Sequence, residues 1–270
     1  MLFDAHVHSI LSLDSEMDPA EAIEVLSRKG FGCCFTDHVD FVTPTREGCD
    51  LTANDIPRAE HDYILPDIHD YPGRFARYKS ENVALGLEIG LTAAFRRANE
   101  KIALKDGLDF IIGSVHFVDG WDLYNGDFYQ NTPGDPYRRM LEYTREMIAL
   151  NGFFDALGHI DYISRYSPLP EKNVLYERYP EEYDAVFNAL IERDKVLELN
   201  TKRLNDPAAA ANMFRVLRRY RELGGRHVTF GSDAHRAEDL ARNFDAARRL
   251  AGEAGLAPVC YKGRKKEAAC

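Results

Sequence analysis

The stretch Leu2-Phe3-Asp4-Ala5-His6-Val7-His8 joins a short apolar run to two histidines. Short apolar runs that alternate with longer amphipathic segments are typical of buried parallel strands. Because alternate side chains of an extended backbone point to the same side, His6 and His8 can bind one ion. Two hydrogen-bonded histidines near a strand end are also common, so this pair alone does not separate a metal site from a structural role.

The same alternation continues along the chain and predicts an α/β fold with seven strands. The predicted strands are Leu2–Val7, Gly32–Thr36, Val83–Leu87, Phe110–Val115, Phe154–Leu157, Val196–Leu199 and His227–Phe230. The predicted helices run from an N-cap at Asp18 to Gly30, and over Thr92–Lys105, Pro136–Leu150, Glu181–Asp194, Pro207–Leu223 and Ala237–Ala251. Seven strands with helices between them indicate a barrel, for which ~250 residues is typical.

Imidazoles and carboxylates occur at the predicted carboxyl ends of most of these strands. The residues concerned are His6, His8, Asp37, His38, Glu88, His116, His159, Asp161, Asp233 and His235, and they include six of the nine histidines. In a parallel barrel all these ends converge on one face, where such folds have their active sites. Six histidines would make an unusual core, because buried polar groups must be paired or bound. We therefore predict a metal site, and these ligand types suit zinc, manganese or iron rather than calcium.

The composition is that of a globular protein. Of the 270 residues, 45% are hydrophobic and 29% are charged, which excludes disordered and collagen-like classes. The net charge of −10 argues against a nucleic-acid partner, since binding phosphates over a wide face needs positive charge. No apolar run approaches the ~18 residues of a membrane span, and no signal sequence is recognisable. Five cysteines without C-x-x-C spacing indicate reduced thiols, so we expect a cytoplasmic protein.

Two segments do not follow the alternation. The segment from Val39 to Ser80 is rich in Pro, Asp and Tyr, and we expect an irregular insertion that is either a lid or binding loop or an inert decoration. The final run from Lys262 to Cys270 predicts a frayed basic tail. Neither segment reads as a linker, so we expect a single domain over residues 1–270.

The motifs of the chain resemble those of the polymerase and histidinol phosphatase (PHP) superfamily. In order, they are H-x-H at His6 and His8, T-D-H at 36–38, a central Glu88, S-V-H at 114–116, G-H at 158–159 and S-D-x-H at 232–235. The run Gly113 to Trp121, and Gly158-His159-Ile160-Asp161 followed by Arg165-Tyr166, look like the histidinol-phosphate phosphatase branch. The resemblance covers nearly the whole chain.

This resemblance implies a distorted (β/α)7 TIM-like barrel of the PHP type with three divalent metal ions, of zinc, manganese or iron. Carried over by position, the first ion is bound by His6, His8, Glu88 and Asp233. The second is bound by Glu88, His116 and His159, so that Glu88 bridges, and the third by Asp14, His38 and His235. Many relatives have a histidine where Asp14 stands, and aspartate keeps a ligand there.

Several residues near these ligands have expected roles. Asp37 and Asp161 look like carboxylates that orient ligating rings, with an exposed loop acid as the alternative for Asp161. Arg165 is either a phosphate clamp or an exposed loop arginine, and a guanidinium suits phosphate oxygens. Lys202-Arg203 departs from the small residue and glycine expected in this branch, and the extra charge could serve a more anionic substrate.

The implied function is hydrolysis of a small-molecule phosphate monoester, with L-histidinol phosphate as the first candidate substrate. We expect Glu88, Asp233 and Arg165 to be catalytic, with metal-activated water as nucleophile. Another phosphoesterase of the superfamily, acting on a nucleotide or other ester, is one alternative. A non-catalytic, metal-stabilised barrel is an alternative of a different class. The remaining histidines, His61, His69 and His227, are predicted not to bind metal.

Overall fold

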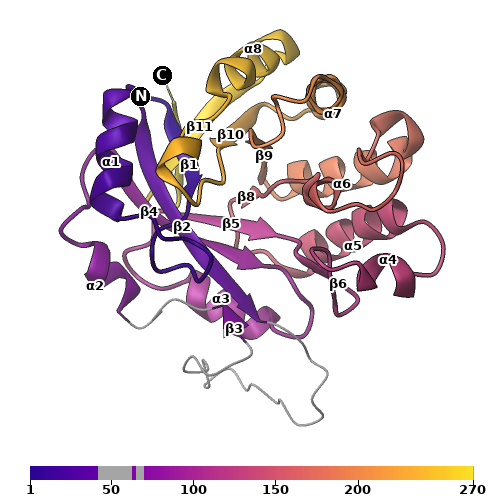
Figure 1. The fold of residues 1–270 in the computed structure, drawn as a ribbon, viewed down its shortest axis with the longest axis horizontal. Coiled ribbons are helices and arrows are strands. Elements are labelled where there is room, and N and C mark those ends of the chain that lie inside the picture. Colours follow the sequence, from indigo (N-terminus) through magenta and orange to yellow (C-terminus); the bar gives the residue numbers. More distant parts are fainter. Residues whose placement is uncertain (42–62, 65–69, 270) are drawn as a thin grey trace.

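A computed structural model describes residues 1–41, 63–64 and 70–269, whose strands and helices are drawn in Figure 1. The strands are β1 (Phe3–Val7), β2 (Gly32–Phe41), β3 (Tyr63–Ile64), β4 (Val83–Gly90), β5 (Phe110–Ser114), β6 (Phe117–Val118), β7 (Trp121–Asp122), β8 (Ala156–Leu157), β9 (Val196–Asn200), β10 (His227–Gly231), β11 (Ala257–Lys262) and β12 (Lys265–Ala268). The α-helices are α1 (Pro19–Arg28), α2 (Tyr71–Phe75), α3 (Arg96–Ala103), α4 (Asp127–Asn131), α5 (Pro136–Leu150), α6 (Pro180–Glu192), α7 (Pro207–Glu222) and α8 (Phe244–Ala254). Short 3₁₀ turns are η1 (Tyr162–Arg165), η2 (Tyr176–Arg178) and η3 (Ala237–Asp239).

Seven parallel strands form the barrel, and they are the seven that the sequence predicts. Their order is β1-β2-β4-β5-β8-β9-β10, and every neighbouring pair is parallel. The ring closes between β1 and the segment after β10, where His8 N–H donates to the Ala234 carbonyl and Asp233 N–H donates to the His6 carbonyl, both at 2.9 Å. The predicted (β/α)7 barrel is confirmed.

Helices surround the strands on the outside (Figure 1), and three of the longer ones begin with the same device. α1, α5 and α7 each start with Asp-Pro, at Asp18, Asp135 and Asp206. The aspartate accepts hydrogen bonds from backbone N–H groups of the first turn, and proline suits the first helical position because its nitrogen has no hydrogen to leave unpaired. These helices therefore begin where the sequence places them, just after the loops at the carboxyl ends of the strands.

The predicted helix Ala237–Ala251 is wrong in its first turns. The structure has the 3₁₀ turn η3, then a break, and α8 begins only at Phe244. At the break Ala241 and Asn243 have φ of 52° and 59°, in the left-handed region that interrupts a helix. The Ala241 N–H donates to Asp4 Oδ2 at 2.8 Å, so a side chain from β1 binds the backbone group that a continuous helix would use.

The predicted basic tail is also wrong for the residues that the structure describes. β12 pairs antiparallel with β11, which itself lies beside β10. In the turn between them, the Arg264 side chain contacts both Asp155 carboxylate oxygens, at 2.6 and 3.1 Å, and donates to the Ala103 and Phe153 carbonyls. The hairpin thus closes the amino end of the barrel, where Tyr261 stacks on Phe110. Cys270 lies outside the described residues.

The segment from Val39 to Ser80 is only partly described. β2 extends to Phe41, five residues beyond its predicted end at Thr36, and β3 and α2 are the other described elements of the segment. Residues 42–62 and 65–69, with His61, His69 and Cys49, lie outside the described residues, so the proposed lid or binding loop stays a prediction. None of the helices in the described part of the chain is long and apolar enough to cross a membrane.

Candidate metal centre and active site

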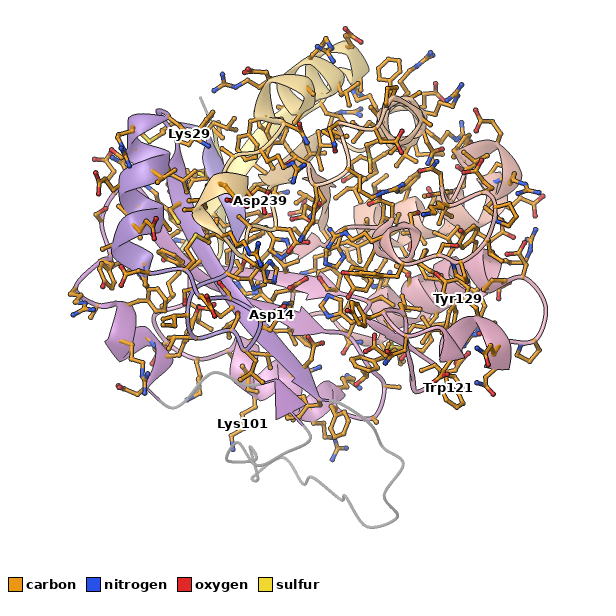
Figure 2. All side chains as sticks on the ribbon, in the orientation of Figure 1. Asp14, Lys29, Lys101, Trp121, Tyr129 and Asp239 are labelled. Carbon is orange, nitrogen blue, oxygen red and sulfur yellow. The ribbon has the colours of Figure 1, made fainter. Side chains whose placement is uncertain are left out.

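The side chains that the sequence predicts as metal ligands meet at the carboxyl ends of the barrel strands. They are His6 in β1, His8 and Asp14 after it, His38 in β2, Glu88 in β4, His116 after β5, His159 after β8, and Asp233 and His235 after β10. All are buried or nearly so except Asp14, whose side chain is 55% exposed. Figure 2 places Asp14 near the middle of the face in view, over the barrel strands. The residues therefore share one site, open to solvent beside Asp14.

A period of two along each strand produces this arrangement. Alternate residues of a strand point to the same side of the sheet, and on the interior side they change from apolar to polar toward the carboxyl end. β5 gives Phe110, Ile112, Ser114 and then His116, and β2 gives Cys34, Thr36 and His38. In β1 an extra residue between Asp4 and Val7 shifts the register against β2. Such a bulge re-aims side chains, here those of His6 and His8.

Glu88 lies at the centre of the cluster and is fully buried. Its Oε1 is 2.8 Å from His159 Nε2 and 3.2 Å from His116 Nε2. Its Oε2 is 2.9 Å from His38 Nδ1 and 3.2 Å from His6 Nε2. The Ser114 hydroxyl donates to Oε1 at 2.6 Å, which fixes the carboxylate plane. Each oxygen thus faces a different set of imidazoles, the geometry that a bridging ligand requires.

Two further groups flank Glu88. Asp233 Oδ1 lies 3.4 Å from His8 Nε2 and 3.9 Å from His6 Nε2. On the solvent side, Asp14 Oδ2 lies 3.0 Å from His235 Nε2 and 3.5 Å from His38 Nε2. The His8 ring stacks between those of His38 and His235, at 4.2 and 4.1 Å between centroids. Donor atoms of four overlapping groups lie close enough together to hold an ion: His6, His8 and Asp233; His6, Glu88 and His159; His38, Glu88 and His116; and His8, His38 and His235.

The donor atoms fit divalent metal ions. His6 Nε2, His8 Nε2 and Glu88 Oε2 are buried and have no hydrogen-bond partner among the described residues. Buried polar atoms without partners are rare because they lose their interaction with water, and these three point at one another. Imidazole nitrogen with carboxylate oxygen is the donor set of zinc, manganese and iron sites. The cluster is therefore built to bind metal.

The charges in the cluster act strongly on one another. Burial tends to raise the pKa of Glu88, but the neighbouring His6, His116 and His38 outweigh it and place that pKa well below its usual range. Burial lowers the pKa of His8 well below its ordinary value, and the adjacent His38 and His235 lower it further. These shifts favour an ionised Glu88 and a neutral His8, the forms in which both bind metal. Burial tends to lower the pKa of His6, His38 and His116, but the surrounding carboxylates outweigh it and raise that pKa well above its ordinary value, so an ion that binds there displaces protons.

Comparison with known proteins identifies the family. Residues 4–202 match the PHP domain family. The chain belongs to this family. It is 34% identical over 98% of both chains to a probable histidinol-phosphatase of Clostridium acetobutylicum, and 29% identical, over 94% of this chain and 91% of the other, to a histidinol-phosphatase of Lactococcus lactis. The crystal structure of the histidinol phosphate phosphatase of Lactococcus lactis, complexed with zinc, L-histidinol and phosphate, aligns with a TM-score of 0.84 and 26% identity over 98% of both chains.

Two carboxylates that sequence reasoning missed contact the PHP histidines from behind. Glu198 Oε1 is 2.6 Å from His6 Nδ1, and both Asp40 oxygens are 3.0 Å from His116 Nδ1. Such partners fix the tautomer and orientation of a ligating ring. Both had a signal in the sequence: Glu198 is a lone acid inside an apolar strand, and Asp40 follows His38 at the two-residue period.

The two carboxylates that we expected to orient the rings have other roles. Asp37 reaches His8 only indirectly: Ser12 Oγ donates to Asp37 at 2.8 Å and lies 3.2 Å from His8 Nδ1. The expectation for Asp161 is wrong, because its carboxylate pairs with Arg203 at 3.1 Å and contacts no ligating ring in the described part of the chain. Arg203 also donates to Asn173, so its guanidinium pairs with neighbouring loop residues.

Arg165 and Lys202 line the cavity at the mouth of the cluster. This cavity of about 160 Å³ is lined by Asp14, His38, His116, His159, Tyr162, Arg165, Tyr166, Lys202, Asp233 and His235. Arg165 Nη1 is 2.5 Å from Asp233 Oδ2, and its Nη2 donates to Asn200 Oδ1. Lys202 Nζ donates to the Asp233 carbonyl at 3.1 Å. Only 9% of the Arg165 side chain is exposed, so the arginine belongs to the site and the alternative of an exposed loop arginine is wrong.

Aromatic side chains form one wall of the same cavity. The Tyr162 ring lies 4.8 Å from the rings of both His116 and His159, and the Arg165 guanidinium lies over it. Tyr166 packs edge-on against Tyr162 and Tyr124 and is 36% exposed. The cavity thus joins a polar, metal-binding floor to an aromatic side that opens toward solvent.

Proposed function

We propose that this protein is a metal-dependent phosphatase that hydrolyses L-histidinol phosphate to L-histidinol and phosphate. The observation that carries the proposal is the convergence of the His6, His8 and Glu88 donor atoms, which are buried without partners. They contact His38 and Asp233, which line the same cavity as the Arg165 guanidinium. The likeness to histidinol-phosphatases over nearly the full length supports the choice of substrate. A cytoplasmic location stays a prediction.

Three ions would use the ligands in the sets that the sequence suggests. The first set is His6, His8, Glu88 and Asp233, the second Glu88, His116 and His159, and the third Asp14, His38 and His235. The distances within each set support this assignment, and Glu88, with two oxygens facing different imidazoles, suits the bridging position. When bound, divalent ions polarise phosphoryl oxygens and lower the pKa of water so that hydroxide is available near neutral pH.

The residues of the chain then position the ester. Arg165 donates to the non-bridging phosphoryl oxygens, and it is held in place by Asp233 and Asn200. Because a guanidinium binds two oxygens at once, it also stabilises the charge that develops during in-line attack. Lys202 adds a second positive charge at the cavity. The leaving alcohol lies toward Tyr162 and Tyr166, whose rings form the aromatic wall of the cavity.

The charges around Asp233 favour its ionised form. Burial tends to raise its pKa, but Arg165, His6 and Lys202 outweigh it and lower that pKa well below the usual range. An ionised Asp233 suits a metal ligand that also orients Arg165. The further hypothesis, that Asp233 relays a proton to the leaving alkoxide, stays a prediction.

Two other functions fit parts of the site. Lys202 gives the cavity one positive charge more than expected for this branch, which favours a more anionic substrate such as a nucleotide phosphate. A non-catalytic barrel would use the ions only for stability, but it gives no reason for Arg165 to line the cavity.

A substrate panel separates these functions. The purified protein is stripped with a chelator, reloaded with zinc, manganese or iron, and assayed for phosphate release from L-histidinol phosphate, nucleoside monophosphates and simple alkyl phosphates. We expect at least a ten-fold higher kcat/KM for L-histidinol phosphate, which corresponds to ~1.4 kcal/mol of transition-state binding. A preference for nucleotides would replace the proposed substrate, and metal binding without hydrolysis of any ester would favour the non-catalytic barrel.

A further inference from the structure

Glu198 contacts two metal-ligand segments at once. It lies in β9 and is 1% exposed. One oxygen, Oε1, is 2.6 Å from His6 Nδ1. The other, Oε2, accepts the backbone N–H of His159 at 2.7 Å and the Asn200 side-chain amide at 3.2 Å. His6 and His159 belong to the first and second ligand sets, so one carboxylate joins the two sets from behind.

We propose that Glu198 is the positioning residue that fixes His6 and His159 together, so that the first two metal ions bind as a coupled pair. The inference rests on the proposed function only in taking these two histidines as metal ligands. Glu88 would join the two sets through bound ions, whereas Glu198 joins them through contacts within the protein. Asp40, which contacts His116 Nδ1 and lies 3.5 Å from His38 Nδ1, contacts neither His6 nor His159.

The hydrogen-bond chemistry explains why a carboxylate is needed at this position. An ionised carboxylate only accepts hydrogen bonds, and Glu198 faces donors on both oxygens. Its contact with His6 Nδ1 places the ring hydrogen on that nitrogen, which leaves the Nε2 lone pair free toward Glu88. A glutamine has one accepting oxygen and one donating nitrogen. It would oppose either the His159 N–H or the protonated His6 Nδ1.

A neighbouring glycine shows how closely this contact is built. A Cβ at Gly231, in β10, would overlap Glu198 Oε1 and lie 2.5 Å from His6 Cβ. Gly231 therefore has no room for a side chain while Glu198 and His6 are in contact. The backbone of β10 thus leaves the space that the pair occupies, and Gly231→Ala would displace the pair without removing any charge.

The first test measures zinc affinity in Glu198→Gln against a matched buried carboxylate. Asp155 also lies in the barrel and accepts a backbone N–H, that of Ile111 at 2.8 Å, but it lies at the opposite end of the strands. Chelator-stripped wild type, Glu198→Gln and Asp155→Asn are titrated with Zn²⁺ in competition with a chromophoric chelator, and their melting temperatures are measured without metal. We expect Glu198→Gln to weaken the binding of two zinc ions together, by about 10- to 100-fold, which is the range for residues that orient ligands. We expect Asp155→Asn to keep wild-type zinc affinity but to have a lower melting temperature.

Two results would overturn the proposal. One is a zinc affinity in Glu198→Gln equal to that of the wild type. The other is a loss of zinc affinity in both variants that is proportional to their loss of melting temperature, because such a loss reflects general destabilisation. If Glu198→Gln does not fold, Gly231→Ala is titrated against Gly252→Ala, whose added Cβ meets nothing within 4 Å. Weaker zinc binding in the first alone supports the proposal, and equal binding overturns it. None of these titrations uses a substrate, so failure of the phosphatase function appears separately, as a zinc-loaded wild type that releases no phosphate.

Discussion

The two ends of the barrel use charged residues in opposite ways. At the amino end, Arg264 is paired with Asp155 and two backbone carbonyls, and Asp155 also accepts from the Ile111 N–H. At the carboxyl end, the Nε2 atoms of His6 and His8 are buried without a hydrogen-bond partner among the described residues. At the amino end the charged groups find their partners within the chain, whereas at the carboxyl end the two nitrogen atoms need a ligand from outside it. The comparison indicates that the amino end contributes stability and the carboxyl end binding and chemistry.

Glu88→Gln tests the carboxyl end with the largest expected effect. Because Glu88 faces five imidazoles, its loss should release the first two ions and lower kcat by more than ~100-fold, the upper range for residues that merely orient ligands. Metal content by mass spectrometry and phosphate release are measured on the same sample. Full metal content with undiminished turnover would show that Glu88 is not a bridging ligand.

Arg165→Ala should lower kcat/KM by about 10- to 1000-fold, as removal of a donor to developing charge does. Since the guanidinium is proposed to contact only the phosphate group of the substrate, the loss of kcat/KM should be similar for every monoester of the panel. Arg165→Lys, which keeps the charge without the two-pronged geometry, should lose less. Hydrolysis that is spared for some esters and abolished for others would mean that Arg165 recognises the alcohol.

Arg264→Ala tests the amino end and should lower the stability of the protein without affecting metal binding or catalysis. Loss of hydrogen bonds to a charged group lowers the free energy of unfolding by about 1.5–3 kcal/mol, which urea unfolding of the metal-free protein measures. Zinc affinity and kcat of the folded variant should match wild type. A variant that keeps its stability but loses zinc would show that the amino end contributes to metal binding as well.

His227→Gln should have the smallest effect. His227 is the first residue of β10 and pairs with Ala257 of β11, so it lies at the amino end of its strand. Zinc stoichiometry should be unchanged and the free energy of unfolding should change by less than about 0.5 kcal/mol, as for most substitutions away from special contacts. A stoichiometric loss of metal in this variant would mean that the ligand sets are incomplete.

The sequence predicted the barrel and the ligand cluster because both depend on local order. An apolar run followed by His38, Glu88 or His116 marks the carboxyl end of a strand wherever the chain goes next, and parallel strands bring those ends together. It missed features that depend on distant partners. Ala241 leaves the helical conformation beside Asp4 of β1, and β12 is a strand only because β11 lies beside it. Glu198 was missed because the run around it indicates a strand but not which histidine lies opposite.

The dependence of hydrolysis on metal at the carboxyl end is measured by titrating Zn²⁺ into chelator-stripped protein, with bound zinc and the rate of phosphate release from L-histidinol phosphate determined on each sample. We expect no hydrolysis without metal and a rate that rises as the carboxyl-end sites fill, with no such rise in Glu88→Gln. Hydrolysis that persists in the stripped protein, or a fully loaded wild type that releases no phosphate, would show that this cluster is not a metal-dependent phosphatase site.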